Sequence, residues 1–261
     1  MTRHHHDTAQ LQERLEQAAE IFSRARLPIA LTGAGISVPS GIPDFRSPGG
    51  LWSRFDPGEV ASVEALDRNP EGVWAFLLDA IRVMTAAEPN EAHEALAAME
   101  ARGAMHAVIT QNIDGLHQRA GSKKVIEFHG SMARYHCHGC SREQDAGVAQ
   151  KLGPADVPWR CGSCGGLVRP EVVFFGESIP PLALAESFRL AEEADAVLVA
   201  GTAGEVAPVN IIPQRIKARG GLLVDATLGS THFDSLCDVK LDAPAEHSLP
   251  AMVRLLSGDG A

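Results

Sequence analysis

The order of apolar runs and of apolar residues at helical spacing predicts a parallel α/β fold. Runs of strand length occur at residues 28–31, 105–110, 125–128, 171–175, 196–200 and 221–224. Apolar residues recur at helical spacing around them, which predicts helices over residues 8–26, 73–84, 90–102 and 181–193. Strands that alternate with helices are typical of a mainly parallel sheet covered by helices.

The first predicted strand runs directly into a glycine turn, Gly33-Ala34-Gly35. Because glycine has no side chain, backbone N–H groups here can approach an anionic ligand, as at a phosphate- or dinucleotide-binding edge. The motif is incomplete, since the usual dinucleotide fingerprint has a third glycine where Val38 stands. Many tight turns contain such a glycine pair without binding anything, so this interpretation needs support from elsewhere in the chain.

Polar residues follow three other predicted strands. The tetrapeptide Gln-Asn-Ile-Asp at residues 111–114 follows one strand, His129 follows another, and Gly201-Thr202 follows a third. Singly, an Asn or Asp after a strand is often a turn former or helix cap, and a lone His there is often structural. Together with the glycine turn, they would line one crevice with carboxylate, amide and imidazole groups. Such a set can bind a ribose-containing cofactor and remove a proton from it.

Four of the five cysteines form two Cys-x-x-Cys pairs, Cys137 with Cys140 and Cys161 with Cys164. Each pair fits a tight turn that places two thiolates on one metal, and two such turns complete a tetrahedron. The alternatives are two disulfides or four reduced thiols, but nothing in the sequence suggests an oxidising compartment. We predict one Zn²⁺ per chain, and a structural one, because four sulfur ligands leave no open position. Cys237 stands apart and is predicted to be a small buried residue.

Composition limits the classes of partner. The chain has 261 residues, 45% of them hydrophobic, enough for one large core or a core with a small satellite domain. The formal net charge of −10 disfavours direct binding to nucleic acid or to an anionic membrane, and it could attract lysine-rich partners. No apolar run reaches the ~18 residues of a membrane-spanning helix, and the N-terminus lacks the apolar centre of a signal peptide. We therefore expect a cytoplasmic protein. We also expect it to be a monomer.

The motifs GAGIS, GIPDFR, TQNIDGLH, EFHG, RPEVVFFGE and GTAGEVAP follow one another along residues 27–224, with the cysteine pairs after EFHG. This ordered set resembles the sirtuins, which are NAD-dependent protein deacylases. The resemblance implies a Rossmann-like NAD-binding domain at residues 1–48, 89–130 and 171–261. It also implies a small domain made of a helical insertion at 49–88 and a zinc ribbon at 131–170.

The resemblance implies that NAD is consumed and that acyl-lysine proteins or peptides are the substrates. His129 would be the general base, and Asn112 and Asp114 would complete the catalytic set. The residues that would contact NAD are Gly33, Ala34, Gly35, Phe45, Arg46, Gln111, Asn112, Ile113, Asp114, Gly201, Thr202, Ala203 and Asp225. The residues that would pair with the peptide as an added strand are Val173, Phe174, Phe175, Gly176 and Glu177. The products would be nicotinamide, O-acyl-ADP-ribose and free lysine.

Three positions depart from the family pattern. Ala203 stands where Ser is common and Asp225 where Asn is typical, and both changes bear on NAD affinity. Family members that prefer acidic acyl groups carry Tyr-x-x-Arg where this chain has Leu77 and Ala80. Neither residue can bind a carboxylate, so we predict a preference for neutral acyl groups.

Two other functions remain open at this point. A mono-ADP-ribosyltransferase on the same scaffold would use the same crevice, although the presence of His129 favours deacylation. A non-catalytic zinc-ribbon module that binds proteins or nucleic acid is disfavoured by the net charge of −10 and by the clustered crevice residues.

Overall fold

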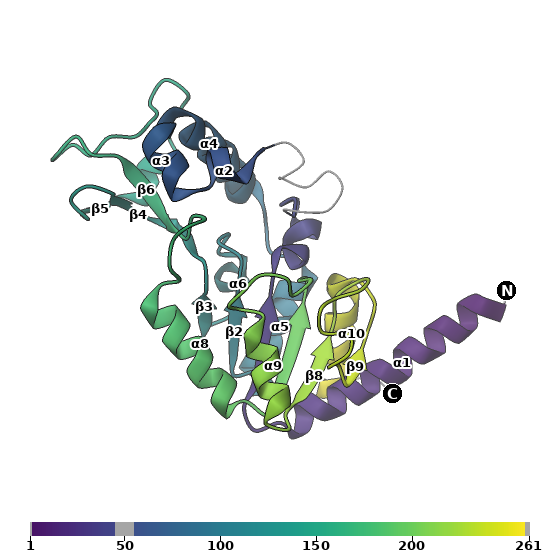
Figure 1. The fold of residues 1–261 in the computed structure, drawn as a ribbon. Helices are drawn as coiled ribbons and strands as arrows, with labels where there is room; N and C mark the ends of the chain where they lie inside the picture. Colours follow the sequence, from purple (N-terminus) through teal and green to yellow (C-terminus); the bar gives the residue numbers. More distant parts are fainter. Residues whose placement is uncertain (1, 45–54, 259–261) are drawn as a thin grey trace.

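The computed structural model describes residues 2–44 and 55–258, which form two lobes (Figure 1). The elements of the larger lobe are α1 (Thr2–Arg24), β1 (Pro28–Thr32), the 3₁₀ helix η1 (Ala34–Ser40), α5 (Glu91–Ala101), β2 (Ala107–Thr110), α6 (Leu116–Arg119), β3 (Val125–Glu127), α8 (Pro181–Glu193), β7 (Ala196–Ala200), α9 (Ile211–Ala218), β8 (Leu222–Asp225), β9 (Val239–Lys240) and α10 (Ala245–Ser257). The elements of the smaller lobe are α2 (Pro57–Val60), α3 (Val63–Arg68), α4 (Pro70–Ala86), β4 (Gly130–Cys137), β5 (Glu143–Gln144), α7 (Ala146–Ala149) and β6 (Val168–Val172).

The larger lobe is built on a six-stranded parallel sheet with the order β3-β2-β1-β7-β8-β9. Strand β1 is buried along its whole length, because β2 and β7 flank it and helices cover both of its faces. Such complete burial explains why its sequence is a continuous apolar run rather than an alternating one.

Alternate residues of β1 enter two different cores. Ala30 packs on one face with apolar side chains of α1, α5 and α10, among them Phe22, Leu96 and Met252. Ile29 and Leu31 pack on the other face with side chains of α8 and α9, which lie on the opposite side of the sheet in Figure 1. Each fully buried large apolar side chain contributes roughly 1.5–3 kcal/mol to folding, so these two layers fix the sheet without further help.

The smaller lobe has a much thinner framework. Its three-stranded antiparallel sheet has the order β5-β4-β6, and the helices α2 to α4 lie against it (Figure 1). The fully buried Trp74 of α4 is the centre of the lobe, and its indole N–H donates to the Val168 carbonyl of β6 at 3.0 Å. Trp159 contacts Trp74 edge-on, with ring centroids 6.1 Å apart. A few aromatic contacts therefore join the helices to the cysteine-bearing sheet.

Most of the elements predicted from the sequence are present, with one difference. The strand expected at residues 171–175 is instead β6, which ends at Val172. The segment beyond it leaves the small sheet because Phe175 forms an isolated parallel bridge with Ser62. The glycine turn after β1, for which no regular element was predicted, continues as the 3₁₀ helix η1, and Pro39 lies within it. In the part of the chain that the structure describes, no helix is both long and apolar enough to span a membrane.

Candidate active site and metal centre

Three strand ends meet at one edge of the large sheet. The register pairs Thr32 of β1 with Thr110 of β2 on one side and with Ala200 of β7 on the other. The residues after β1, β2 and β7 therefore emerge together. This is also the point where the strand order reverses direction, because β2 and β3 extend the sheet one way and β7 to β9 the other. Open α/β sheets bind their ligands at such a switch point.

The glycine turn after β1 packs tightly against the loop after β7. The Gly35 N–H donates to the Gly201 carbonyl at 2.8 Å, and a Cβ on Gly35 would lie 2.9 Å from the Gly201 Cα. A Cβ on Gly33 would lie 2.7 Å from the Thr202 Cβ. The glycines thus permit two chain segments to touch. The N–H of Ala34 has no partner among the described residues, which leaves it available to an anionic ligand.

Ser37 of η1 holds the side chains of Asn112 and Asp114 in place. The Ser37 hydroxyl donates to the Asp114 carboxylate at 2.8 Å and accepts from the Asn112 side-chain amide at 3.0 Å. Asp114 also accepts from the N–H of Leu116, the first residue of α6, at 2.9 Å. Burial raises the pKa of Asp114 above its usual value, although these two hydrogen bonds act in the opposite direction. Amide and carboxyl groups are therefore fixed side by side at the end of β2.

Gln111 joins the ends of β2 and β7. Its side-chain amide donates to the Thr202 hydroxyl at 3.0 Å, and the same hydroxyl accepts from the Gly204 N–H at 3.3 Å. The predicted residues Gln111, Gly201 and Thr202 are thus brought together in the structure, next to the glycine turn.

His129 lies between β3 and β4, and its ring points back toward the end of β2. The Nδ1 atom is 3.1 Å from the Gln111 carbonyl oxygen. A carbonyl can only accept, so Nδ1 carries the proton and the other ring nitrogen, Nε2, keeps a lone pair. Burial lowers the pKa of His129 below its usual value, and the bond to the Gln111 carbonyl offsets this only in part. The imidazole is therefore neutral at pH 7 and able to accept a proton.

Two further histidines are buried behind this edge. The ring of His93, from α5, is 4.9 Å from that of His117, from α6, measured between centroids. His93 Nε2 approaches the Ser37 hydroxyl at 3.5 Å, and His117 Nε2 lies 2.9 Å from the Thr32 hydroxyl. Burial lowers the pKa of His93 to about 4 and that of His117 to about 3, the latter also through the charge of His93. Both rings are thus neutral supports of the crevice.

The segment at residues 173–177 leaves β6 and runs along the inner side of the small lobe. The Phe175 N–H donates to the Ala61 carbonyl at 2.8 Å, and the Phe175 carbonyl accepts from the Val63 N–H at 3.0 Å. The backbone of Phe175 therefore faces the helical insertion. The Val173 N–H donates to the carbonyl of His129 at 2.9 Å. The Val173 carbonyl and both backbone groups of Gly176 have no partner among the described residues. They are the groups that an added strand can use.

The remaining residues predicted to contact NAD differ in exposure and in their hydrogen-bond partners. Ala203 is exposed after β7. Asp225 is fully buried at the end of β8, where its carboxylate accepts from Thr231 at 2.7 Å and from Lys240 at 2.9 Å. The carboxylate is therefore already bonded within the protein. The Ile113 carbonyl accepts from the Met132 N–H at 3.0 Å. The predicted contacts Phe45 and Arg46 lie outside the described residues.

The four paired cysteines meet at one end of the small sheet. Their Sγ atoms all lie within 4.8 Å of one another. The Cys137–Cys164 pair is 3.4 Å apart and the Cys140–Cys161 pair 4.0 Å apart. A tetrahedral zinc with Zn–S bonds of about 2.3 Å requires sulfur separations of roughly 3.8 Å, so the set fits one ion. All five cysteines of the chain are free of disulfides. The four thiolates leave no open position, which makes the zinc structural.

Sequence reasoning did not single out Ser37, His93, His117 or Arg169. Ser37 and His117 lie inside the motifs GAGIS and TQNIDGLH, but their polar character alone does not tell which partner they meet. His93 had a signal, because it lies on the apolar face of α5 with Ala92 and Leu96. An imidazole on such a face must find a hydrogen bond when it is buried.

Comparison with known proteins agrees with this geometry. The model of the Sir2 family matches residues 33–208. A protein of Thermococcus kodakarensis named NAD-dependent protein deacylase is 43% identical over 244 residues, which cover 92% of this chain and 95% of the relative. A solved Sir2 homolog–NAD complex superimposes with a TM-score of 0.87 at 37% identity, covering 94% of each chain. A solved Sir2–p53 peptide–NAD⁺ complex has a TM-score of 0.83 at 36% identity, covering 95% of this chain and 99% of that one.

Proposed function

Because the chain belongs to the Sir2 family, we propose that it is an NAD-dependent protein-lysine deacylase that acts on neutral acyl groups. The observation that carries this proposal is the meeting of a neutral histidine, an amide and a carboxyl group with the glycine turn at the β1/β7 switch point. The products are free lysine, nicotinamide and O-acyl-ADP-ribose, so NAD is a co-substrate.

Different sets of crevice residues are assigned to different parts of the cofactor. We assign the pyrophosphate to the turn at residues 33–35, where the Ala34 N–H is without a partner, and the nicotinamide end to residues 111–114. Residues 201–203 and the end of β8 are assigned to the adenosine half. Bound NAD supplies an electrophilic sugar carbon, which an acyl oxygen can attack. Phe45 and Arg46 are assigned to the same cofactor site.

His129 acts as the general base in this proposal. With Nδ1 held by the Gln111 carbonyl, Nε2 is the atom that accepts a proton from a ribose hydroxyl. The lowered pKa ensures that this atom is unprotonated at neutral pH. Asn112 and Asp114 hold the nicotinamide end in a single orientation, because Ser37 fixes both side chains.

We assign substrate binding to residues 173–177, named here the substrate edge. The peptide adds as a strand to the Val173 carbonyl and the Gly176 backbone, on the side opposite to the helical insertion. Main-chain pairing of this kind requires little of the peptide sequence. The Val173 N–H bond to the carbonyl of His129 links the substrate edge to the residue of the general base.

Several further features are part of the proposal. We propose a Rossmann-like domain (1–48, 89–130 and 171–261) and a small domain (49–88 and 131–170), a division that the presence of two lobes supports (Figure 1). Leu77 packs in the core of the small lobe, and neither it nor Ala80 carries a charge, which favours neutral acyl groups. Four reduced thiolates suit a reducing compartment such as the cytoplasm. We propose a monomer that does not bind nucleic acid.

The decisive experiment incubates the protein with an acetyl-lysine peptide, with and without NAD, and identifies the products by mass. We expect deacetylated peptide, nicotinamide and O-acetyl-ADP-ribose, and no reaction without NAD. A peptide or protein that gains ADP-ribose would instead support the transferase. A matched succinyl peptide tests the acyl preference, and equal kcat/KM for the two peptides would contradict it.

A further inference from the structure

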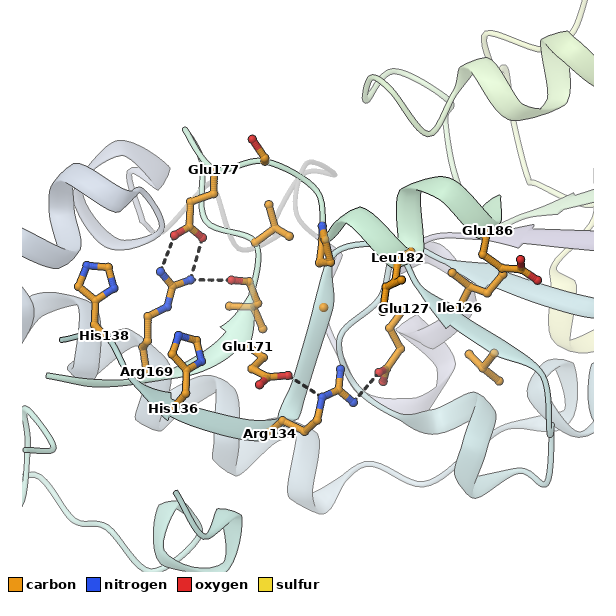
Figure 2. Close-up of a pocket in the computed structure, with 17 residues that line it drawn as sticks. Ile126, Glu127, Arg134, His136, His138, Arg169, Glu171, Glu177, Leu182 and Glu186 are labelled. Atoms are coloured by element: carbon orange, nitrogen blue, oxygen red, sulfur yellow. Dashed lines mark hydrogen bonds and ion pairs between the residues drawn. The ribbon is translucent and has the colours of Figure 1, made fainter. Parts of the chain in front are cut away.

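Arg169 of β6 is the buried arginine of the described part of the chain, with a side chain that is 4% exposed. Its guanidinium group forms a two-pronged ion pair with the Glu177 carboxylate, at 2.5 Å and 2.7 Å (Figure 2). The same group donates to the Val172 carbonyl at 2.7 Å. Both arms of the fork are thus occupied, by the last residue of β6 and by Glu177 in the segment that follows it.

The same contacts reach Phe174. The guanidinium carbon lies 4.4 Å from the centroid of the Phe174 ring, which is a cation–π distance. The Phe174 N–H donates to the Glu177 carboxylate at 2.9 Å, and its carbonyl accepts from the Glu177 N–H at 3.0 Å. Burial would raise the pKa of Glu177, but the bonds from Arg169 and Phe174 outweigh it, and the pKa lies below its usual value. The pair is therefore fully charged at neutral pH.

A neighbouring arginine shows the contrast. Arg134 of β4 also pairs with two carboxylates in the same cavity of about 850 Å³, those of Glu127 and Glu171 (Figure 2). Its side chain is 53% exposed, so its ion pairs lie in water and contribute little. Burying a guanidinium group is costly unless every arm is matched, so a buried pair is weak evidence for added stability but can select one conformation. Arg169 therefore suits a conformational role.

Resting on the proposed function, we propose that Arg169 is the positioning residue of the substrate edge. Through Glu177 it engages the Phe174 backbone on the enzyme side, while Phe175 is engaged by the helical insertion. These bonds leave the Val173 carbonyl and the Gly176 backbone as the groups that meet the peptide. The substrate edge is thus ordered before substrate arrives, which removes an ordering cost from peptide binding.

The fork geometry is essential to this role. A planar guanidinium group can bond both oxygens of Glu177 and the Val172 carbonyl at once while stacking on an aromatic ring. A lysine at the same position keeps the charge but offers a single point of attachment. Arg169→Lys is therefore expected to restore only part of the function lost in Arg169→Met.

The test compares Arg169→Met, Arg169→Lys, Glu177→Gln and the double variant Arg169→Met/Glu177→Gln. For the two single replacements that break the fork, we expect the peptide KM to rise at least about tenfold, the effect of losing charged hydrogen bonds. The kcat should stay within roughly threefold and the NAD KM within roughly twofold, because neither residue lies at the cofactor crevice. The double variant should be no worse than the worse single variant, since all remove one fork.

A matched control is Arg215→Met. Arg215 also stacks on a phenylalanine, Phe188 at 4.7 Å, and pairs with a glutamate, Glu192 at 2.9 Å, but it lies between α8 and α9. Its replacement should leave the peptide KM unchanged. In the free protein, Arg169→Met should also speed amide hydrogen exchange across residues 172–177.

The possible outcomes separate the two proposals. A wild type that does not deacylate an acetyl peptide with NAD overturns the proposed function. An active wild type, with Arg169→Met and Glu177→Gln at unchanged peptide KM, overturns the role of Arg169 alone. Equal increases in peptide and NAD KM would also overturn it, because they would indicate a general loss of structure. If Arg169→Met fails to fold, the peptide KM of Glu177→Gln decides whether the role of Arg169 holds, because Glu177 is partly exposed and its replacement disturbs the fold less.

Discussion

Strand β1 and strand β4 occupy the centres of their sheets in very different surroundings. All five residues of β1 are buried, with paired strands on both sides and helical layers on both faces. Of the eight residues of β4, half are buried, and one of its two neighbours is the two-residue strand β5. The large sheet thus lies between two apolar layers, whereas the small sheet has one smaller apolar cluster and four thiolates at its end.

The difference matters because, in the proposed function, one region binds NAD and the other binds the peptide. The cofactor crevice is built from the ends of strands β1, β2 and β7, which the large core fixes. The substrate edge is the continuation of β6, which the metal site and Arg169 fix. Damage to one region should therefore affect NAD and damage to the other should affect the peptide.

The largest effect is expected from the metal. Cys161→Ser should lose zinc, disorder the small sheet and reduce deacylation more than about a hundredfold, because the metal-binding free energy is coupled to folding. Zinc content and peptide turnover measure this, while ADP-ribose binding should survive within about tenfold. Cys237→Ser is the control, since burial raises the pKa of that thiol to about 11 and it lies apart from the cluster. Zinc-free protein with normal kinetics would contradict this prediction, because the ribbon would then fold without the metal.

Replacing the general base comes next. His129→Ala should lower kcat/KM by ~10²–10⁴ and leave the unfolding midpoint nearly unchanged, because the loss is of proton transfer rather than packing. The acid limb of the pH–rate profile of the wild type should lie below pH ~6.5, in line with the lowered pKa. His106→Ala is the control, because His106 is exposed and immediately precedes β2, at the end of that strand far from the crevice. Activity within about threefold of the wild type would make His129 structural.

Acid should destabilise the large lobe through its two buried histidines. The folded-state pKa values of His93 and His117 lie near 4 and 3, so the unfolded chain binds more protons once the pH falls below ~6.5. Stability is therefore full above pH 6.5 and falls toward pH 4, by about 3 kcal/mol for His93 alone.

Two signals can separate the lobes in a urea titration. The described tryptophans, Trp74 and Trp159, are both in the small lobe, so their fluorescence reports on it. Far-UV circular dichroism reports mainly on the large lobe, which contains most of the helical residues. At pH 5 the second signal should be lost at lower urea than at pH 7.5. His93→Gln should reduce this shift. A urea midpoint that does not depend on pH would contradict the assignment.

The smallest effect concerns NAD. Ala203→Ser would add one hydroxyl at an exposed position after β7, where family members commonly have it. A single hydrogen bond of this kind should lower the NAD KM by roughly two- to tenfold and leave the peptide KM unchanged. Steady-state kinetics with each substrate varied in turn provide the measurement. A changed peptide KM would mean that the two regions are coupled at this loop.

The sequence allowed the crevice to be predicted because parallel strands end at one edge, so residues 33, 111 and 201 must meet wherever the strands pair. The metal site was predictable for a more local reason, since its spacing fits two tight turns. What could not be predicted depends on packing between distant segments. The bond from Ser37 to Asp114 requires the fold of η1 beneath α6. The bond from Lys240 to Asp225 requires β9 to lie next to β8.

The central position of β1 has a consequence for the order in which the chain is made. Residues 28–32 are synthesised long before their partner strand β7, which begins only at Ala196. At ~5–20 residues per second, the nascent strand waits on the order of ten seconds or more for the neighbour that completes the crevice. Cys164, the last zinc ligand, emerges before Ala196. During synthesis the ribbon can therefore take up its metal while the cofactor crevice does not yet exist.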